Sequence, residues 1–277
     1  MDSTISPFNA VVGIKLSTLR GKHVVITGAS SGIGRAAAIA FAECGSHVHL
    51  VARRSALLED VAVRCRQRGG DATAYTLDVR DRQAVQELAE ALEAHGGCDI
   101  AIANAGVMQL GPLLEMDFGD IERQFEVNVY GVIHVLQAFG KYMKRRGGGI
   151  LMPVSSIVSV QSLPKYAAYC GTKFGVRAIA DAMAMELRGT GVSVCHILPG
   201  ATQSELHQHM SPAEMPRATR QAKRVPAEQV ARAMVKAAKA PRPVVLCDWR
   251  ARLLYWGQRF VPGLVHWTIK VITKREA

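Results

Sequence analysis

The sequence predicts an α/β fold with a doubly wound, seven-stranded parallel sheet and helices on both faces. Short apolar runs rich in β-branched residues alternate regularly with longer helical patterns, which is typical of such a sheet. A glycine-rich turn joins the first strand to the first helix at residues 27–34. The length of 277 residues suits one large domain, and 49% hydrophobic and 21% charged residues are ordinary for a soluble globular protein.

The first strand–helix unit has the form of a dinucleotide-binding turn. The strand Lys22–Thr27 (KHVVIT) leads into TGASSGIG, and an Ala-rich helical stretch follows at Arg35–Cys44. Glycines permit a tight turn and a close approach of phosphates, and the backbone N–H groups at the helix start favour anions. The alternative is a structural turn without a ligand.

The remaining elements follow in alternation. We expect strands at 22–27, 47–52, 72–77, 99–103, 150–155, 192–198 and 243–247, and helices that include 81–94, 118–146, 166–189 and 226–239. Pro226 suits a first helical turn. The predicted organisation is an N-terminal extension (1–21), a core domain (22–247) with a long loop at 201–225, and an aromatic, basic tail (248–277) that Pro262-Gly263 divides into two helical pieces.

The end of the second strand predicts the cofactor. A site that prefers NAD places an acid there to bind the ribose 2′-hydroxyl, but this strand ends in Ala52, Arg53 and Arg54. A guanidinium suits a 2′-phosphate through paired charge-assisted hydrogen bonds. The sequence therefore predicts NADP(H), with Arg53 as the main contact; the alternative is that both arginines are solvated loop charges.

Three further residues predict acid–base chemistry on an oxygen. Tyr169 and Lys173 are four residues apart, which puts them on one face of a helix, and Ser156 precedes Tyr169 by 13 residues. An ammonium favours a phenolate and lowers the phenol pKa, and Ser156 can donate a hydrogen bond to an oxygen that gains negative charge. The alternative is a core tyrosine beside a solvated lysine.

Together, T-G-x-x-x-G-x-G, Y-x-x-x-K and the upstream serine resemble the short-chain dehydrogenase/reductase family, in its single-domain Rossmann-fold branch. The resemblance runs from about Lys22 to Leu246. Further matches are Asp78 in LDVRD, Asn104-Ala105-Gly106, Asn128 in FEVNVYG and Pro199-Gly200.

The resemblance implies a role for each matched residue. Tyr169 donates a proton to the carbonyl oxygen, and Ser156 polarises that oxygen. Lys173 holds the nicotinamide ribose and lowers the pKa of Tyr169, and Asn128 positions a water. The implied cofactor contacts are Thr27, Gly28, Ser30, Ser31, Gly32, Ile33, Gly34, Arg53, Arg54, Asp78, Val79, Asn104, Ala105, Gly106, Tyr169, Lys173, Pro199, Gly200, Thr202 and Ser204.

Three positions depart from the family pattern. Pro153 removes a ladder donor inside a central strand, which could shift Ser156. The hydroxyl that usually follows the proline-glycine turn could be Thr202 or Ser204. Cys170 directly follows Tyr169, and we interpret it as a packed thiol.

The family resemblance makes the loop at 201–225 the cover of the active site. Leu206, Met210 and Met215 offer it an apolar lining. Positive charge comes from Arg217, Arg220, Lys223 and Arg224. We expect NADPH-dependent reduction of a mid-sized, apolar or lipid-like ketone or aldehyde. The alternatives are an NADP⁺-dependent alcohol or steroid dehydrogenase and a non-catalytic NADP(H)-binding sensor or scaffold.

Partners follow from the helices, the charge and the tail. The resemblance implies a homodimer or homotetramer through 118–146 and 166–189. The net charge is +11, but no nucleic-acid-binding module is evident. In the tail, Trp249, Leu253, Trp256 and Phe260 recur at three- to four-residue spacing beside basic residues. They suit burial against protein, a lid or a subunit contact, or alternatively a membrane interface.

Metal and export signals are not evident in the sequence. The six cysteines are scattered without zinc-site spacing, which indicates reduced thiols of a cytoplasmic protein. His207 and His209 could bind a metal, but two histidines without further ligands are more typical of a polar loop. We expect no metal, no signal peptide and no membrane-spanning segment.

Overall fold

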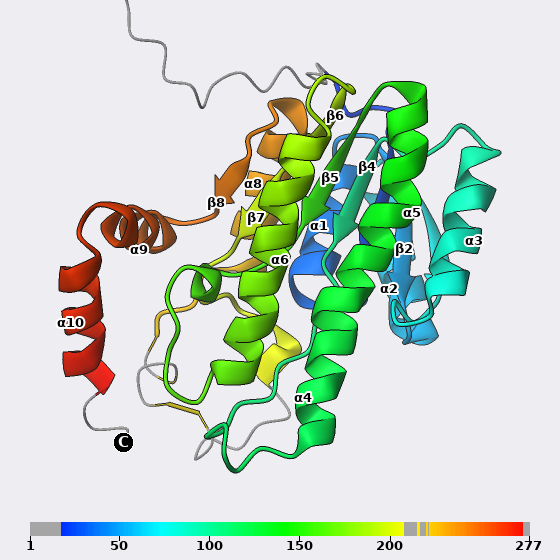
Figure 1. The fold of residues 1–277 in the computed structure, drawn as a ribbon. Coiled ribbons are helices and arrows are strands. Elements are labelled where there is room, and N and C mark those ends of the chain that lie inside the picture. Colours follow the sequence, from blue (N-terminus) through cyan, green and yellow to red (C-terminus); the bar gives the residue numbers. More distant parts are fainter. Residues whose placement is uncertain (1–17, 208–214, 217–219, 221, 274–277) are drawn as a thin grey trace, which may run out of the picture.

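The computed structural model describes residues 18–207, 215–216, 220 and 222–273 (Figure 1). A parallel sheet lies between two layers of helices, as the sequence predicts. The N-terminal extension lies almost wholly outside the described residues. The strands are β1 (His23–Thr27), β2 (His47–Ala52), β3 (Asp71–Thr76), β4 (Ile100–Ala103), β5 (Gly149–Pro153), β6 (Val192–Val194), β7 (His196–Leu198) and β8 (Val244–Leu246).

Within the described residues, the main sheet has six parallel strands in the order β3-β2-β1-β4-β5-β6. The strand order reverses direction between β1 and β4, so the carboxyl ends of these two strands open a crevice for a ligand. The strand β8 pairs in parallel with β7 in a separate two-stranded sheet. The prediction of one seven-stranded sheet is therefore slightly wrong.

Pro153 accounts for this difference. Leu151 accepts a hydrogen bond from the N–H of Cys195, and Ser155 donates to Ile197, so the N–H at position 153 would donate to the carbonyl of Cys195. Proline has no N–H. The predicted strand 192–198 is divided at Cys195 into β6 and β7, whereas the N–H of Val154 still donates to Ala103 at 2.9 Å. The proline thus interrupts the neighbouring strand rather than its own.

The helices cover both faces of the sheet. They are α1 (Gly32–Ala42), α2 (Ser55–Gln67), α3 (Arg82–Glu93), α4 (Phe118–Phe125), α5 (Gly131–Arg146), α6 (Ala167–Glu186), α8 (Ala227–Lys239), α9 (Trp249–Phe260) and α10 (Pro262–Thr273). Alternate strand residues point to opposite faces. Val24 and Ile26 pack with α1, α2 and α8 in one core cluster, and Val25 packs with α3, α5 and α6 in the other.

Two predicted helical segments are divided in the structure. The segment 118–146 contains a π-helical turn, η1 (Glu126–Tyr130), between α4 and α5. Such turns are frequent at functional sites, and this one contains Asn128. The tail is divided just before Pro262, as the sequence predicts, into α9 and α10, and both helices project from one side of the body (Figure 1). None of the helices in the described ranges has the length and hydropathy needed to cross a bilayer.

The first turn of α1 gives a testable prediction about the fold. A Cβ added at Gly34 would overlap the backbone carbonyl of Gly28, which cannot move without shifting β1. Gly34→Ala should therefore lower the free energy of unfolding by about 1–3 kcal/mol in urea denaturation. Gly263→Ala is the matched control, because its Cβ would meet no atom within 4 Å and, in a helix, should leave stability unchanged or raise it by up to about 1 kcal/mol. Equal unfolding curves for Gly34→Ala and the unaltered protein would contradict this packing.

Candidate active site

A cavity of about 790 Å³ opens at the carboxyl ends of the strands. It extends from the turn after β1 to α6 and to the segment after β7. Most predicted site residues line it: Gly28, Ser30, Ser31, Gly32, Ile33, Arg53, Arg54, Asp78, Val79, Asn104, Ala105, Gly106, Ser156, Tyr169, Lys173, Pro199, Gly200, Thr202 and Ser204. The lining does not include Thr27, Gly34 and Asn128, which lie behind the residues of the cavity wall.

The glycine-rich turn approaches the loop after β4 closely because Gly28 has no side chain. Gly28 has a φ of +67°, and a Cβ there would lie 2.8 Å from the Cα of Ala105. The hydroxyl of Thr27 accepts the N–H groups of Asn104 and Ala105 at 3.0 and 3.1 Å. Thr27 therefore fixes the distance between the turn and the loop after β4. The turn and the start of α1 fit a dinucleotide phosphate.

Asn128 holds the loop after β4 from the other side. Its amide makes two 2.8 Å hydrogen bonds with Val107, because Oδ1 accepts the N–H and Nδ2 donates to the carbonyl. Nδ2 also lies 3.2 Å from the hydroxyl of Thr172. Asn128 is completely buried, so the π-helical turn supplies a structural clamp at this position. The sequence analysis missed Thr172, which no motif singles out.

Tyr169 and Lys173 lie on one face of α6, as predicted from their spacing. The Lys173 ammonium lies 5.6 Å from the Tyr169 ring centroid and donates to the carbonyl of Val154 at 3.2 Å. A Cβ at Gly106 would lie 3.8 Å from this nitrogen, so the loop after β4 comes close to α6 at this point. The side chains of Tyr169 and Lys173 are 8% and 4% exposed.

Ser156 occupies the position that the family spacing selects. It is half-buried, lines the cavity, and accepts the N–H of Val158 at 3.3 Å through Oγ. The hydroxyl of Ser155 instead donates to the carbonyl of Lys173 at 2.8 Å. The ladder resumes at Val154 after Pro153, and an effect of Pro153 on Ser156 stays a prediction. Cys170 is buried, as expected for a packed thiol.

Burial controls the proton affinities of this pair. It raises the pKa of the Tyr169 phenol well above its ordinary value, and Tyr166 and Cys170 add to the effect. Burial also lowers the pKa of Lys173 to about 8. The expected lowering of the Tyr169 pKa by Lys173 is therefore not found in this geometry. The cost of burying the phenolate exceeds the attraction of an ammonium that is directed to Val154.

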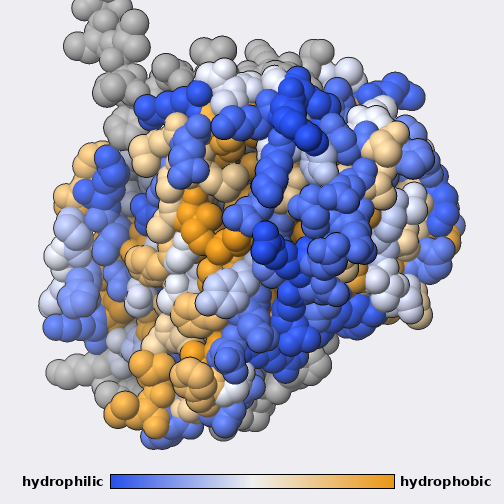
Figure 2. All heavy atoms as spheres, turned by 45° about the vertical axis from the view of Figure 1, so that its right-hand side comes forward, coloured by the Kyte–Doolittle hydropathy of each residue, from blue (hydrophilic) through white to orange (hydrophobic). Residues whose placement is uncertain are grey.

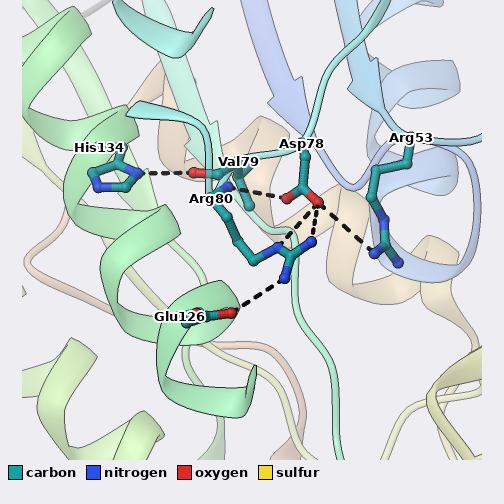
Figure 3. Close-up of polar contacts among 6 residues, drawn as sticks. All are labelled: Arg53, Asp78, Val79, Arg80, Glu126 and His134. Carbon is teal, nitrogen blue, oxygen red and sulfur yellow. Dashed lines mark hydrogen bonds and ion pairs between the residues drawn. The ribbon is translucent and has the colours of Figure 1, made fainter. Parts of the chain in front are cut away.

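Charged residues surround the opposite end of the cavity (Figure 3). The Asp78 carboxylate accepts hydrogen bonds from Arg80 at 2.9 and 3.1 Å and lies 3.9 Å from Arg53. Burial opposes the charge of Asp78, but the Arg80 hydrogen bonds outweigh it, so the pKa of Asp78 is lowered. Arg80 also contacts Glu126 at 3.2 Å, and His134 holds the Val79 carbonyl at 2.9 Å.

Arg54 lies against the glycine-rich turn more closely than the sequence indicates. Its guanidinium donates to the hydroxyls of Ser30 and Ser31, each at 3.0 Å, and to the Glu205 carboxylate at 3.0 Å. Glu205 belongs to η3 (Glu205–His207), 151 positions along the chain. This ion pair joins the turn to the segment after β7, and local sequence patterns do not reveal it.

The turn Pro199-Gly200 is held from two sides. The Pro199 carbonyl accepts the N–H of Ile157 at 2.8 Å, and the N–H of Gly200 donates to Asp248 at 3.2 Å. The other carboxylate oxygen of Asp248 accepts the N–H of Ala251 at 2.9 Å and caps α9. Thr202 donates to the Gly200 carbonyl at 3.0 Å, whereas Ser204 lies beside Gly32. The sequence analysis missed the role of Asp248.

The cavity wall around Tyr169 is apolar. Tyr166, Tyr169, Leu110 and Cys170 form a separate core cluster, and several side chains pack against it: Met108, Val158, Leu163, Leu206 and Met215. Of the three residues expected to provide the lining, Leu206 lines the cavity and Met215 packs against this cluster. Met210, His209 and Arg217 lie outside the described residues, whereas Arg224 lines the cavity. In the described part of the chain, no group of three or more potential ligands could hold a metal ion.

Comparison with known proteins adds independent findings. Residues 22–215 match the family described as short chain dehydrogenase. The chain is 37% identical to the "Probable oxidoreductase EphD" of Mycobacterium bovis over 185 residues, which are 66% of this chain and 31% of that protein. The match thus spans about a third of this relative's length.

Two solved structures resemble the whole fold. A short-chain dehydrogenase/reductase from Burkholderia phymatum in complex with NAD has a TM-score of 0.80 and 26% identity, over 90% of this chain and 96% of that one. An alcohol dehydrogenase from the archaeon Thermococcus sibiricus complexed with 5-hydroxy-NADP has a TM-score of 0.71 and 30% identity, over 82% and 96%. Similar structures therefore contain either type of nicotinamide dinucleotide.

The buried lysine gives a prediction with a defined pH dependence. The pKa of Lys173 lies below the value of about 10.5 expected when unfolded, so the folded protein binds fewer protons between about pH 8 and 10.5 and gains stability as the pH rises. Lys173→Met removes this effect. The variant should be more stable than the unaltered protein by about 3 kcal/mol at pH 7 and by about 1 kcal/mol at pH 10.

Urea denaturation at both pH values measures this difference. Lys141→Met is a control on the exposed surface of α5, and its effect should not depend on pH. A Lys173→Met variant that is less stable than the unaltered protein at pH 7 would contradict the cost assigned to the buried ammonium.

Proposed function

Since this chain belongs to the short-chain dehydrogenase/reductase family, we propose that it is an NADPH-dependent oxidoreductase that reduces a ketone or aldehyde to an alcohol. The main support is the convergence of Lys173 and Asn128 on Gly106, with Tyr169 and Ser156 in the lining of the same cavity. We propose that residues 22–247 form the catalytic domain and that 201–225 cover the substrate.

The cofactor fits the residues that line the other end of the cavity. Gly28 and Gly32 line the cavity, and their missing side chains let the turn approach Ala105 and Ser204 closely. When bound, NADPH supplies the hydride. We infer that the turn after β1 holds the pyrophosphate, that Asp78 and Val79 border the adenine, and that Asn104-Ala105-Gly106 form the floor.

The charged end of the cavity supports a preference for the 2′-phosphate. Arg53 and Arg54 follow β2 directly, and Arg54 already donates to two hydroxyls of the glycine-rich turn. Arg53 pairs with Asp78, and Arg54 pairs with Glu205. A bound 2′-phosphate would compete with these carboxylates for the two guanidinium groups. We propose that Arg54 shares the phosphate contact with Arg53.

Tyr169 acts as the proton donor in this mechanism. Its phenol is protonated at neutral pH and can donate to a carbonyl oxygen as negative charge develops there, but the raised pKa that burial produces makes it a weaker acid than an ordinary phenol. The hydroxyl of Ser156 donates a hydrogen bond to the same oxygen. Lys173, with its pKa lowered to about 8, holds a proton that can replace the one lost from Tyr169. Asn128 fixes the loop beside this ammonium.

The substrate and the assembly follow from apolar surfaces. The side chains around Tyr166 and Tyr169 favour a mid-sized apolar carbonyl compound.

Figure 2 shows a band of apolar surface down one face of the molecule, bordered on its right by hydrophilic side chains. Tyr130, Phe174 and Met185 are exposed apolar residues of η1 and α6. We propose that α5 and α6 form a homodimer or homotetramer contact.

Turnover tests the proposed function. We expect oxidation of NADPH, followed at 340 nm, with apolar ketones, aldehydes or quinones, and Tyr169→Phe should lower kcat by at least about 10³-fold while NADPH still binds. Phe118→Leu, at an exposed position outside the cavity lining, is the control and should retain activity. NADPH binding without turnover on the whole panel would favour a binding protein, and alcohol oxidation alone would favour the oxidative direction.

The Arg54–Glu205 ion pair predicts a change in cofactor affinity. Glu205→Gln removes the carboxylate that competes with a 2′-phosphate for Arg54, so we expect NADPH to bind about five- to tenfold more tightly and NADH to bind as before. Dissociation constants from fluorescence titration measure both. Glu43→Gln, which removes the exposed partner of Arg68, should change neither. Equal tightening for NADH and NADPH would contradict a 2′-phosphate contact at Arg54.

A further inference from the structure

The two tail helices carry an apolar ridge that the described residues do not cover. On α9, Trp249, Leu253, Trp256 and Phe260 are 66%, 68%, 48% and 72% exposed. On α10, Leu264 and Trp267 are 60% and 63% exposed. The sequence favoured burial of these residues against protein, but among the described residues they face outward.

The ridge of α9 is narrow and has arginines on both sides. Its four residues are spaced by four, three and four positions, so they fall within about 60° around the helix axis at about 100° per residue. Arg252 and Arg259 flank the ridge on one side and Arg250 on the other. The opposite face holds buried Ala251 and Tyr255, whose ring lies 5.8 Å from the Arg177 guanidinium. That face attaches α9 to the body.

The second helix continues this arrangement. A Cβ at Gly257 of α9 would lie 3.1 Å from Val265, so the two helices pack closely there. Leu264 and Trp267 lie on the side of α10 away from Val265, at a spacing of three residues. Aromatic residues beside arginines and lysine on short helices are typical of a helix that lies in a membrane interface.

The charge of the tail indicates what kind of surface the ridge contacts. Residues 249–273 contain Arg250, Arg252, Arg259 and Lys270 but no aspartate or glutamate. A second copy of the tail would bring like charges together, whereas an anionic surface complements them. We propose that α9 and α10 dock on an anionic lipid bilayer, with the aromatic ridge among the headgroups and the basic side chains on lipid phosphates.

This docking would hold the active site near the lipid. Asp248 starts α9 and also holds the N–H of Gly200, and α9 contacts η2 (Ile157–Ser159), which follows Ser156. If the proposed function holds, apolar carbonyl compounds could enter from the bilayer surface. The lipid contact itself does not depend on catalysis.

The chain provides its own spectroscopic probe. All three tryptophans, Trp249, Trp256 and Trp267, lie in the tail helices. Vesicles of phosphatidylcholine with phosphatidylglycerol should shift the tryptophan emission of the full chain to shorter wavelength and sediment with it. Phosphatidylcholine alone should have little effect, and high salt should weaken the anionic contact.

Substitutions that keep the tryptophans test the ridge and the charges separately. Leu253→Ser with Phe260→Ser should weaken vesicle binding at least tenfold, because both remove large apolar groups. Arg252→Gln and Arg259→Gln should each weaken it about fivefold. The matched controls, Leu114→Ser and Arg68→Gln, change exposed residues of the domain that precedes the tail and should have no effect on vesicle binding. Reduction of a water-soluble carbonyl should be unchanged in all of them.

Three results would overturn the proposal. The first is no emission shift and no sedimentation with anionic vesicles. The second is an equal loss of binding in the control variants. The third is a change of molar mass on Leu253→Ser with Phe260→Ser but unchanged vesicle binding, because the ridge would then contact a second copy. A chain that binds vesicles but reduces no carbonyl would contradict the proposed function alone.

Discussion

The close contact between the β1–α1 turn and the loop after β4 is the constraint on which the site depends. Thr27 holds the N–H groups of Asn104 and Ala105, and the absence of a side chain at Gly34 lets α1 approach the carbonyl of Gly28. A shift here would change the cavity floor, because the same loop is clamped from behind by Asn128. Hydrogen bonds between side chains and backbone, together with missing side chains, therefore set the geometry of this pocket.

The site also places charge where burial is costly. Lys173 is almost completely buried, and its ammonium donates a hydrogen bond to the carbonyl of Val154. Burial moves the pKa values of Lys173 and Tyr169 apart, downward for the ammonium and upward for the phenol. The neutral phenol and the labile ammonium proton suit a proton relay. The fold tolerates the destabilising lysine because the large cores on both faces of the sheet stabilise the surrounding strands.

Sequence patterns predicted what depends on local residues. The periodicity gave the strands and helices, and the spacing of Tyr169 and Lys173 put them on one face of α6. The division of the sixth strand required knowledge of register, because the missing N–H of Pro153 acts on Cys195 in a neighbouring strand. The π-helical turn and the Arg54–Glu205 pair depend on contacts between distant segments. The phenol pKa depends on burial, which the motif does not encode.

Asp248 gives the boundary between core and tail a physical meaning. One carboxylate oxygen completes the turn at Gly200 and the other starts α9, so the first residue of the predicted tail is structurally part of the domain that contains the cavity. A shortened or chimeric chain that ends at Cys247 would lose a support of the pocket together with the tail. Swaps of the tail between relatives would preserve the pocket only if the junction kept an aspartate and a helical first turn behind it.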